Sequence, residues 1–93
     1  MTFNFNHKVV LITGAGAGLG YACAMAFAEA GAKLAITDIS QQALDKAVAD
    51  LQEAGADVLG LINDASNSAD VNAMLEAVVA RFGRLDIAVN NAG

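Results

Sequence analysis

The residues best suited to chemistry lie in a glycine-rich stretch, TGAGAGLG, that begins at the last residue of the apolar run VVLIT. The stretch does not fit the general dinucleotide pattern G-x-G-x-x-G, because a start at Gly14 places Leu19 in the last slot. It does fit T-G-x-x-x-G-x-G, formed by Thr13, Gly14, Gly18 and Gly20. A glycine-rich turn between a strand and a helix can present backbone N–H groups to phosphate oxygens. The spacing therefore predicts a loop that binds the pyrophosphate of a dinucleotide.

Each glycine has an expected physical role in such a loop. Gly14 would let the chain turn sharply off the strand, Gly18 would let backbone approach the pyrophosphate, and Gly20 would let the helix pack close to the sheet. A purely structural strand-to-helix turn is the alternative. A P-loop is excluded, because Tyr21 and Ala22 stand where that motif needs lysine and a hydroxyl group.

Asp38 is the second candidate, at the end of the run LAITD and 24 positions after Gly14. In a strand-helix-strand unit, a carboxylate there can accept hydrogen bonds from the adenosine ribose and repel a 2′-phosphate. No lysine or arginine occurs in the glycine loop or directly after Asp38. These observations favour NAD over NADP. Asp38 could instead cap the next helix, a role that is compatible with a cap at Ser40.

Four short apolar runs and three stretches of helical spacing must position these residues. The runs 9–13, 34–37, 58–62 and 87–90 are mostly continuous, as in parallel strands that are covered on both faces. Between them, apolar residues recur at helical spacing. The three sets are Leu19, Ala22, Cys23, Ala26, Phe27 and Ala30; Leu44, Ala47, Val48 and Leu51; and Val71, Met74, Leu75, Val78, Val79 and Phe82.

The order of these elements predicts an α/β fold of the form βαβαβαβ with a parallel sheet, because strand crossovers are right-handed. Ser40 is the expected N-cap of the second helix, and Ser68 or Asp70 that of the third. The third helix should cross back to the opposite face of the sheet. One helix cannot cover that face, so we expect the 93-residue chain to associate with itself there or at the open edge of the fourth strand. A glycine should end each helix: Gly31, Gly55 and Gly83.

Composition narrows the class of protein. A chain of 93 residues with 56% hydrophobic residues, 16% charged residues and no proline is typical of one small globular domain. A net charge of −5 speaks against nucleic acid or an anionic membrane as a partner and favours a small-molecule ligand. The single cysteine, Cys23, cannot form an intrachain disulfide, and MTFNFNHK does not read as a secretory signal. We expect a cytoplasmic protein without a transmembrane segment or a metal site.

The final residues, LDIAVNNAG, add a second motif at the end of the fourth predicted strand. With T-G-x-x-x-G-x-G after the first strand and N-N-A-G after the fourth, the chain resembles the N-terminal part of the short-chain dehydrogenase/reductase family. The resemblance covers essentially all of the sequence. It implies a Rossmann-type sheet with helices on both faces and strand order 3-2-1-4. Residues 1–93 would be the NAD-binding portion of a single Rossmann domain, truncated after N-N-A-G.

The resemblance also implies roles for residues that are ambiguous by themselves. Asp64 would meet the adenine amino group and the backbone of Ala65 the ring, although an aspartate there could be only a solvated loop residue. Asn90 and Gly93 would line the cofactor ribose, and Asn91 would tie neighbouring strands together, although the two asparagines could equally form a turn. The full set of expected cofactor-binding residues is Gly14, Ala17, Gly18, Leu19, Gly20, Asp38, Ile39, Asp64, Ala65, Asn90 and Gly93.

The catalytic residues of the family have no counterpart in this sequence. The family uses a serine, a tyrosine and a lysine four residues after the tyrosine, whereas Tyr21 is followed four places on by Met25. We expect the complete enzyme, as a homo-oligomer, to transfer hydride between NAD(H) and an alcohol or ketone, and this chain to be inactive. Two alternatives are a non-catalytic nucleotide-binding module and a methyltransferase, against which the N-N-A-G ending speaks.

Overall fold

Strands and helices alternate along the whole of the described chain. The computed structural model describes residues 4–64 and 66–91. The elements are β1 (Val9–Thr13), α1 (Gly18–Glu29), β2 (Lys33–Asp38), α2 (Gln41–Glu53), β3 (Val58–Ile62), α3 (Ser68–Phe82) and β4 (Ile87–Asn90). The predicted order is confirmed, and three of the four predicted strands have the same bounds in the structure.

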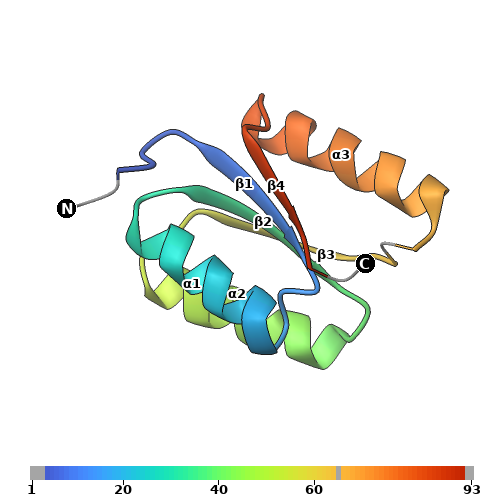
Figure 1. The fold of residues 1–93 in the computed structure, drawn as a ribbon, viewed down its shortest axis with the longest axis horizontal. Coiled ribbons are helices and arrows are strands. Elements are labelled where there is room, and N and C mark those ends of the chain that lie inside the picture. The colour runs from blue at the N-terminus through green and yellow to red at the C-terminus, as the bar shows by residue number, and fades with distance from the viewer. Residues whose placement is uncertain (1–3, 65, 92–93) are drawn as a thin grey trace.

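The sheet has the predicted strand order, β3-β2-β1-β4, and every pairing is parallel. Val10 in β1 lies opposite Leu34 in β2 on one side and Ile87 in β4 on the other. Helices α1 and α2 cover one face, and α3 covers the opposite face (Figure 1). The fold is therefore a Rossmann-type arrangement of three layers.

Small residues bring α1 close to the sheet. Its buried residues are Gly20, Ala24 and Ala28, whereas Leu19 is 72% exposed. The predicted buried face of this helix is therefore wrong for Leu19, Ala22 and Ala26, which are exposed, whereas Cys23 and Phe27 do pack against the core. Apolar side chains surround nearly the whole helix, so their spacing does not mark one face, and close packing selects the smallest residues. Cys23 is half-buried and packs against the core on this side of the sheet.

The other two helices bury or half-bury their predicted apolar residues, except for Val79 of α3, which is 50% exposed. One of their two N-caps also differs from the prediction. The Ser40 side chain accepts a hydrogen bond from the backbone N–H of Ala43 at 3.2 Å, as an N-cap does. The N-cap of α3 is Asn67, not Ser68 or Asp70. Asn67 has the extended backbone conformation that a cap requires, and the two later residues already lie within the helix.

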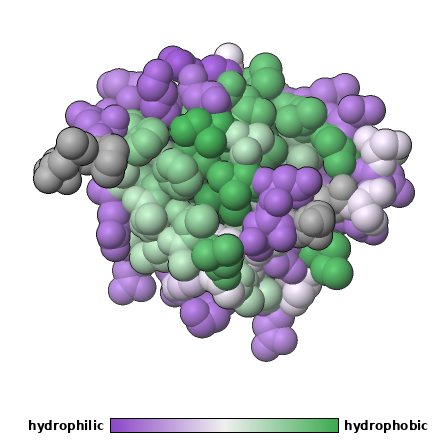
Figure 2. Space-filling view, in the orientation of Figure 1, coloured by the Kyte–Doolittle hydropathy of each residue, from purple (hydrophilic) through white to green (hydrophobic). Residues whose placement is uncertain are grey.

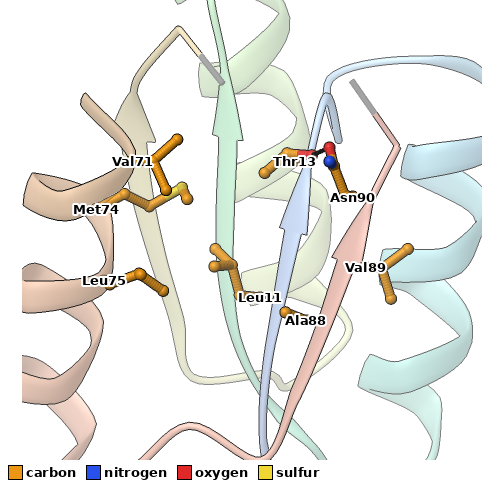
Figure 3. A pocket seen from close by; sticks show the side chains of 8 residues that line it. All are labelled: Leu11, Thr13, Val71, Met74, Leu75, Ala88, Val89 and Asn90. Atoms are coloured by element: carbon orange, nitrogen blue, oxygen red, sulfur yellow. Dashed lines mark hydrogen bonds between the residues drawn. The ribbon is translucent and has the colours of Figure 1, made fainter. Parts of the chain in front are cut away.

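The face that α3 covers is packed in part. Val9, Leu11, Ala35, Met74 and Val78 form its buried cluster. Beside this cluster lies an open groove of about 170 Å³ between α3 and strands β1 and β4 (Figure 3). We call it the apolar groove, and its lining residues are Leu11, Thr13, Val71, Met74, Leu75, Ala88, Val89 and Asn90.

Strand β4 adds an edge to this uncovered surface. Within the described residues β4 pairs with β1 and with no other strand. Figure 2 shows apolar surface across the middle of the molecule, between α3 above and α1 and α2 below. As the sequence predicts, a single helix leaves part of this face open.

We predict that the 93-residue chain, prepared by itself, associates through the apolar groove or the β4 edge, because the groove presents apolar surface and the edge presents unpaired backbone groups. Sedimentation equilibrium should show dimers or larger species. Ala88→Lys, which places a charge on β4 where the side chain is exposed, should shift the distribution toward monomer. The matched control is Ala73→Lys on the exposed surface of α3, which should leave it unchanged. A monomer at all concentrations would contradict the prediction.

Candidate cofactor-binding site

The candidate residues gather at one edge of the sheet. In a parallel sheet the carboxyl ends of all strands lie at the same edge, and ligands bind where the strand order reverses. That reversal falls between β1 and β4, because β2 and β3 continue on the other side of β1. Thr13 ends β1, Asp38 ends β2 and Asn90 ends β4. The topology therefore places three residues with hydrogen-bonding side chains around one site.

Two features of the chain between β1 and the first turn of α1 require glycine: backbone angles with positive φ, and close packing at Gly20. Gly14 and Gly18 have φ values of 64° and 60°, in the left-handed region that favours glycine. A Cβ atom at Gly20 would collide with the carbonyl oxygen of Gly14 and lie 2.7 Å from Nδ2 of Asn91. Gly14 and Gly20 thus have the turning and packing roles expected from the sequence.

The first turn of α1 faces open space. The N-cap residue, Ala17, has no side chain that could accept a hydrogen bond from the helix N–H groups, and none is made. A Cβ atom built on Gly18 would meet nothing within 4 Å. Leu19 is exposed. Uncapped N–H groups at the positive end of a helix dipole, with room in front of them, can bind an anionic phosphate.

Asp38 joins the glycine loop to the start of α2. Its Oδ2 accepts a hydrogen bond from the backbone N–H of Gly16 at 3.0 Å, and its Oδ1 accepts one from the N–H of Ser40 at 2.9 Å. Neither donor lies within α2, which begins at Gln41 after its N-cap Ser40, so the alternative in which Asp38 caps this helix is wrong. The carboxylate is instead held in place by two backbone donors from different segments.

Gly16 is a site residue that sequence reasoning missed. A Cβ atom there would lie 2.6 Å from Oδ2 of Asp38 and 2.7 Å from Cβ of Ala43. In T-G-x-x-x-G-x-G this position is unspecified, and its requirement for glycine arises from contacts with residues more than 20 positions away. The presence of a third glycine between Gly14 and Gly18 was the available signal.

A cavity of about 280 Å³ joins the glycine loop to the ends of β2 and β3. Four of its lining residues belong to the expected set, and three, Thr37, Asn63 and Ser66, do not. Ala65 and Gly93, also expected, lie outside the described residues. The four expected residues that the cavity brings together are Gly14, Asp38, Ile39 and Asp64.

Asp64 contributes a negative charge to this cavity. Its Oδ1 accepts hydrogen bonds from the backbone N–H of Ser66 at 2.9 Å and from the Ser66 hydroxyl at 2.6 Å. These two bonds, the hydroxyl bond first, hold the pKa of the Asp64 carboxyl below its usual range. The side chain is therefore ionised at neutral pH and can accept hydrogen bonds but not donate them.

Asn63, directly before it, is an unexpected buried polar residue that follows β3. It is 8% exposed, and its Nδ2 donates a hydrogen bond to the backbone carbonyl of Asp70 at 2.8 Å. Within the described part of the chain, its Oδ1 is buried without a hydrogen-bond partner. A buried acceptor in that state costs about 1–3 kcal/mol and calls for an explanation. A polar residue directly after the apolar run VLGLI was the signal in the sequence.

The end of β4 is tied to the end of β1 by side chains. The Thr13 hydroxyl donates to Oδ1 of Asn90 at 3.1 Å and accepts from the backbone N–H of Asn91 at the same distance. Figure 3 shows the side chains of Thr13 and Asn90 together at the ends of the two strands. Nδ2 of Asn91 donates to the carbonyl of Gly14 at 3.2 Å, which is the strand-tying role that the resemblance implies.

The side chain of Tyr21 is bonded to Asp50 of α2, outside the cavity. The Tyr21 hydroxyl donates to Oδ2 of Asp50 at 2.7 Å, and Lys46 Nζ lies 2.8 Å from the same oxygen. The bond to the carboxylate raises the pKa of Tyr21, so this phenol is poorly suited to give up a proton. Across residues 4–64 and 66–91, no group of three or more metal-ligating side chains occurs, and no helix is long and apolar enough to span a membrane.

Comparison with known proteins agrees with this geometry. The family model of the short chain dehydrogenases matches residues 8–93. An uncharacterized oxidoreductase of Thermotoga maritima is 46% identical over 97% of this chain and 35% of its own length. The chain thus spans about a third of that relative.

Solved structures give the same result. A short chain dehydrogenase/reductase from Burkholderia phymatum, in complex with NAD, is 41% identical, with a TM-score of 0.88 over 94% of this chain and 31% of its own. A variant of actinorhodin polyketide ketoreductase with NADPH is 31% identical, with a TM-score of 0.89 over all of this chain and 35% of its own. The matched sequence, the strand order and the glycine loop together show that this chain belongs to the short chain dehydrogenase family.

Proposed function

We propose that residues 1–93 form the N-terminal NAD(H)-binding portion of an oxidoreductase that transfers hydride between the nicotinamide ring and an alcohol or ketone. The observation that carries the proposal is the Asp38 carboxylate, held by Gly16 and Ser40 at the cavity that the glycine loop also lines. A cytoplasmic location and a homo-oligomeric assembly belong to the same proposal.

The residues present fit a dinucleotide, which would supply the hydride chemistry. The uncapped N–H groups at the start of α1 would bind the pyrophosphate, next to the open space at Gly18. Asp38 would accept hydrogen bonds from the adenosine ribose. Asp64 would accept one from the adenine amino group, with Ile39 against the base. Asn90, held by Thr13, would line the second ribose. Each of these residues binds or orients the cofactor.

The choice of NAD over NADP depends on charge. The solved relatives include complexes with either cofactor, so the choice comes from this chain. The cavity lining contains two carboxylates, from Asp38 and Asp64, and no lysine or arginine from the described residues. A 2′-phosphate placed beside Asp38 would be repelled without compensation.

A nucleotide-binding module without redox chemistry is the second candidate. The observation that favours it is the bond that ties the Tyr21 hydroxyl to Asp50, which leaves this phenol poorly suited to proton transfer. The full-length protein separates the two candidates. Calorimetric titration with NAD tests binding, and an NAD-reduction assay over a panel of alcohols tests turnover. Binding without turnover would favour the module, and no binding would contradict both.

We predict that the double variant Asp38→Ala, Ile39→Arg of the full-length protein raises the ratio of kcat/KM for NADP over NAD by about tenfold or more, because one repulsive charge is lost and one attractive charge is gained. Glu53→Ala, which removes a charge at the far end of α2, is the control and should leave the ratio unchanged. If the unmodified protein already prefers NADP, the argument from Asp38 is wrong.

We also predict that Gly16→Ala raises the dissociation constant for NAD by about tenfold or more, because the added Cβ displaces the Asp38 carboxylate. Calorimetry of the full-length variant measures the affinity, and thermal unfolding monitors the fold. The control is Gly55→Ala, at a φ of 93° and away from the site. It should cost about 1 kcal/mol of stability and leave NAD affinity unchanged. Equal affinity in wild type and Gly16→Ala would mean that the loop is only a turn.

A further inference from the structure

Asn63 connects three segments that meet at the base end of the cavity. Its backbone N–H donates to the carbonyl of Asp38 at 3.1 Å, which extends the pairing of β3 with β2 by one residue. Its side-chain Nδ2 donates to the carbonyl of Asp70 in the first turn of α3. One residue thus fixes the end of β3 relative to β2 and α3.

Asp64 is also bonded to the first turn of α3, through the side chain of Asp70. Its backbone N–H donates to Oδ2 of Asp70 at 3.1 Å. Asp70 is itself positioned by the helix cap, because its N–H donates to Oδ1 of Asn67 at 3.2 Å. Asp70 therefore holds the peptide between Asn63 and Asp64 through two bonds, one from the Asn63 side chain to its carbonyl and one from the Asp64 N–H to its carboxylate. We call this pair of bonds the clamp. It sets the direction in which the Asp64 side chain points.

The clamp explains why an asparagine occupies this buried position. A leucine of similar size would satisfy the burial and would leave no acceptor without a partner. Asn63 instead has a buried Oδ1 that no residue in 4–64 or 66–91 contacts with a hydrogen bond, and local violations of this kind are expected where function requires them. What asparagine supplies and leucine cannot is the Nδ2 donor, which makes the hydrogen bond to the Asp70 carbonyl.

We propose that Asn63 is a positioning residue for base recognition: by holding the peptide before Asp64 against Asp70, it places the Asp64 carboxylate to accept a hydrogen bond from the exocyclic amino group of adenine. The inference rests on the proposed function and deepens it. It adds that the cavity selects adenine over other bases, and that Asn63, which is outside the expected set, controls this selection.

Base discrimination reports directly on this placement. An ionised carboxylate only accepts hydrogen bonds, so it attracts the amino group of adenine. It repels the carbonyl oxygen that hypoxanthine carries at the same ring position. A well-placed Asp64 therefore separates NAD from nicotinamide hypoxanthine dinucleotide, and a poorly placed one does not. A residue that only stabilises the fold would weaken both ligands equally.

The test measures dissociation constants of both dinucleotides by calorimetry on the full-length protein. We expect wild type to prefer NAD by about tenfold or more, and Asn63→Leu to reduce this preference to about twofold or less. The thermal unfolding midpoint of Asn63→Leu should be unchanged or raised, because the unpaired acceptor is gone. Asn72→Leu, the same substitution at an exposed position on α3, is the matched control and should leave preference and affinity at wild-type values.

A second variant removes the clamp from its other side. Asp70→Ala loses the side-chain bond to the Asp64 N–H but keeps the backbone carbonyl, and it should also reduce the preference for NAD. Retained preference in both variants, or an equal loss of affinity for both dinucleotides, would overturn the inference. Wild type that binds NAD without preference for adenine would overturn it while leaving NAD binding intact. Wild type that binds neither dinucleotide would contradict the proposed function itself.

Discussion

The lack of a side chain at Gly20 is the constraint on which the rest of the site depends. The carbonyl of Gly14 and the amide of Asn91 occupy the space that a Cβ would need. Helix α1 can therefore begin directly against the ends of β1 and β4, with its N–H groups at the sheet edge. A larger residue would push the helix away and separate the uncapped N–H groups from Asp38 and Asn90.

The face of the sheet that α3 covers is packed less completely than the face that α1 and α2 cover. The direction of the crossovers is the cause. Helices α1 and α2 bury one face with small and aliphatic residues. The third crossover returns to the opposite side to place β4 beside β1, so α3 has that face to itself. The same reversal creates the site at the carboxyl edge and leaves the apolar groove beside β4.

Polar residues at the strand ends serve the fold and the proposed ligand together. The Asp38 carboxylate uses both oxygens on backbone donors and still lines the cavity. Thr13 joins β1 to Asn90 and Asn91 through one hydroxyl. These bonds orient the acceptors before a ligand arrives, which reduces the ordering that binding must accomplish.

Much of the fold could be predicted from the sequence, because continuous apolar runs, glycine stops and the 24-residue separation of Gly14 and Asp38 are local signals. The cofactor-binding roles stay predictions, although the structure brings Gly14, Asp38, Ile39 and Asp64 to one cavity. The buried face of α1 could not be predicted, because apolar residues surround that helix and spacing marks a face only where polar residues mark the other. Asn67, Ser68 and Asp70, three polar residues within four positions, could each cap α3, and the extended backbone at Asn67 decided among them.

Gly16 and Asn63 show what the tertiary structure decided. Nothing near Gly16 in the sequence requires glycine, since the atoms that exclude a Cβ belong to Asp38 and Ala43. The role of Asn63 depends on a carbonyl in the first turn of α3. The sequence by itself determined which segments form strands and helices and which residue types end the strands. Contacts between residues distant in the chain decided which of those residues hold one another in place, because such contacts exist only once the sheet has brought the strand ends together.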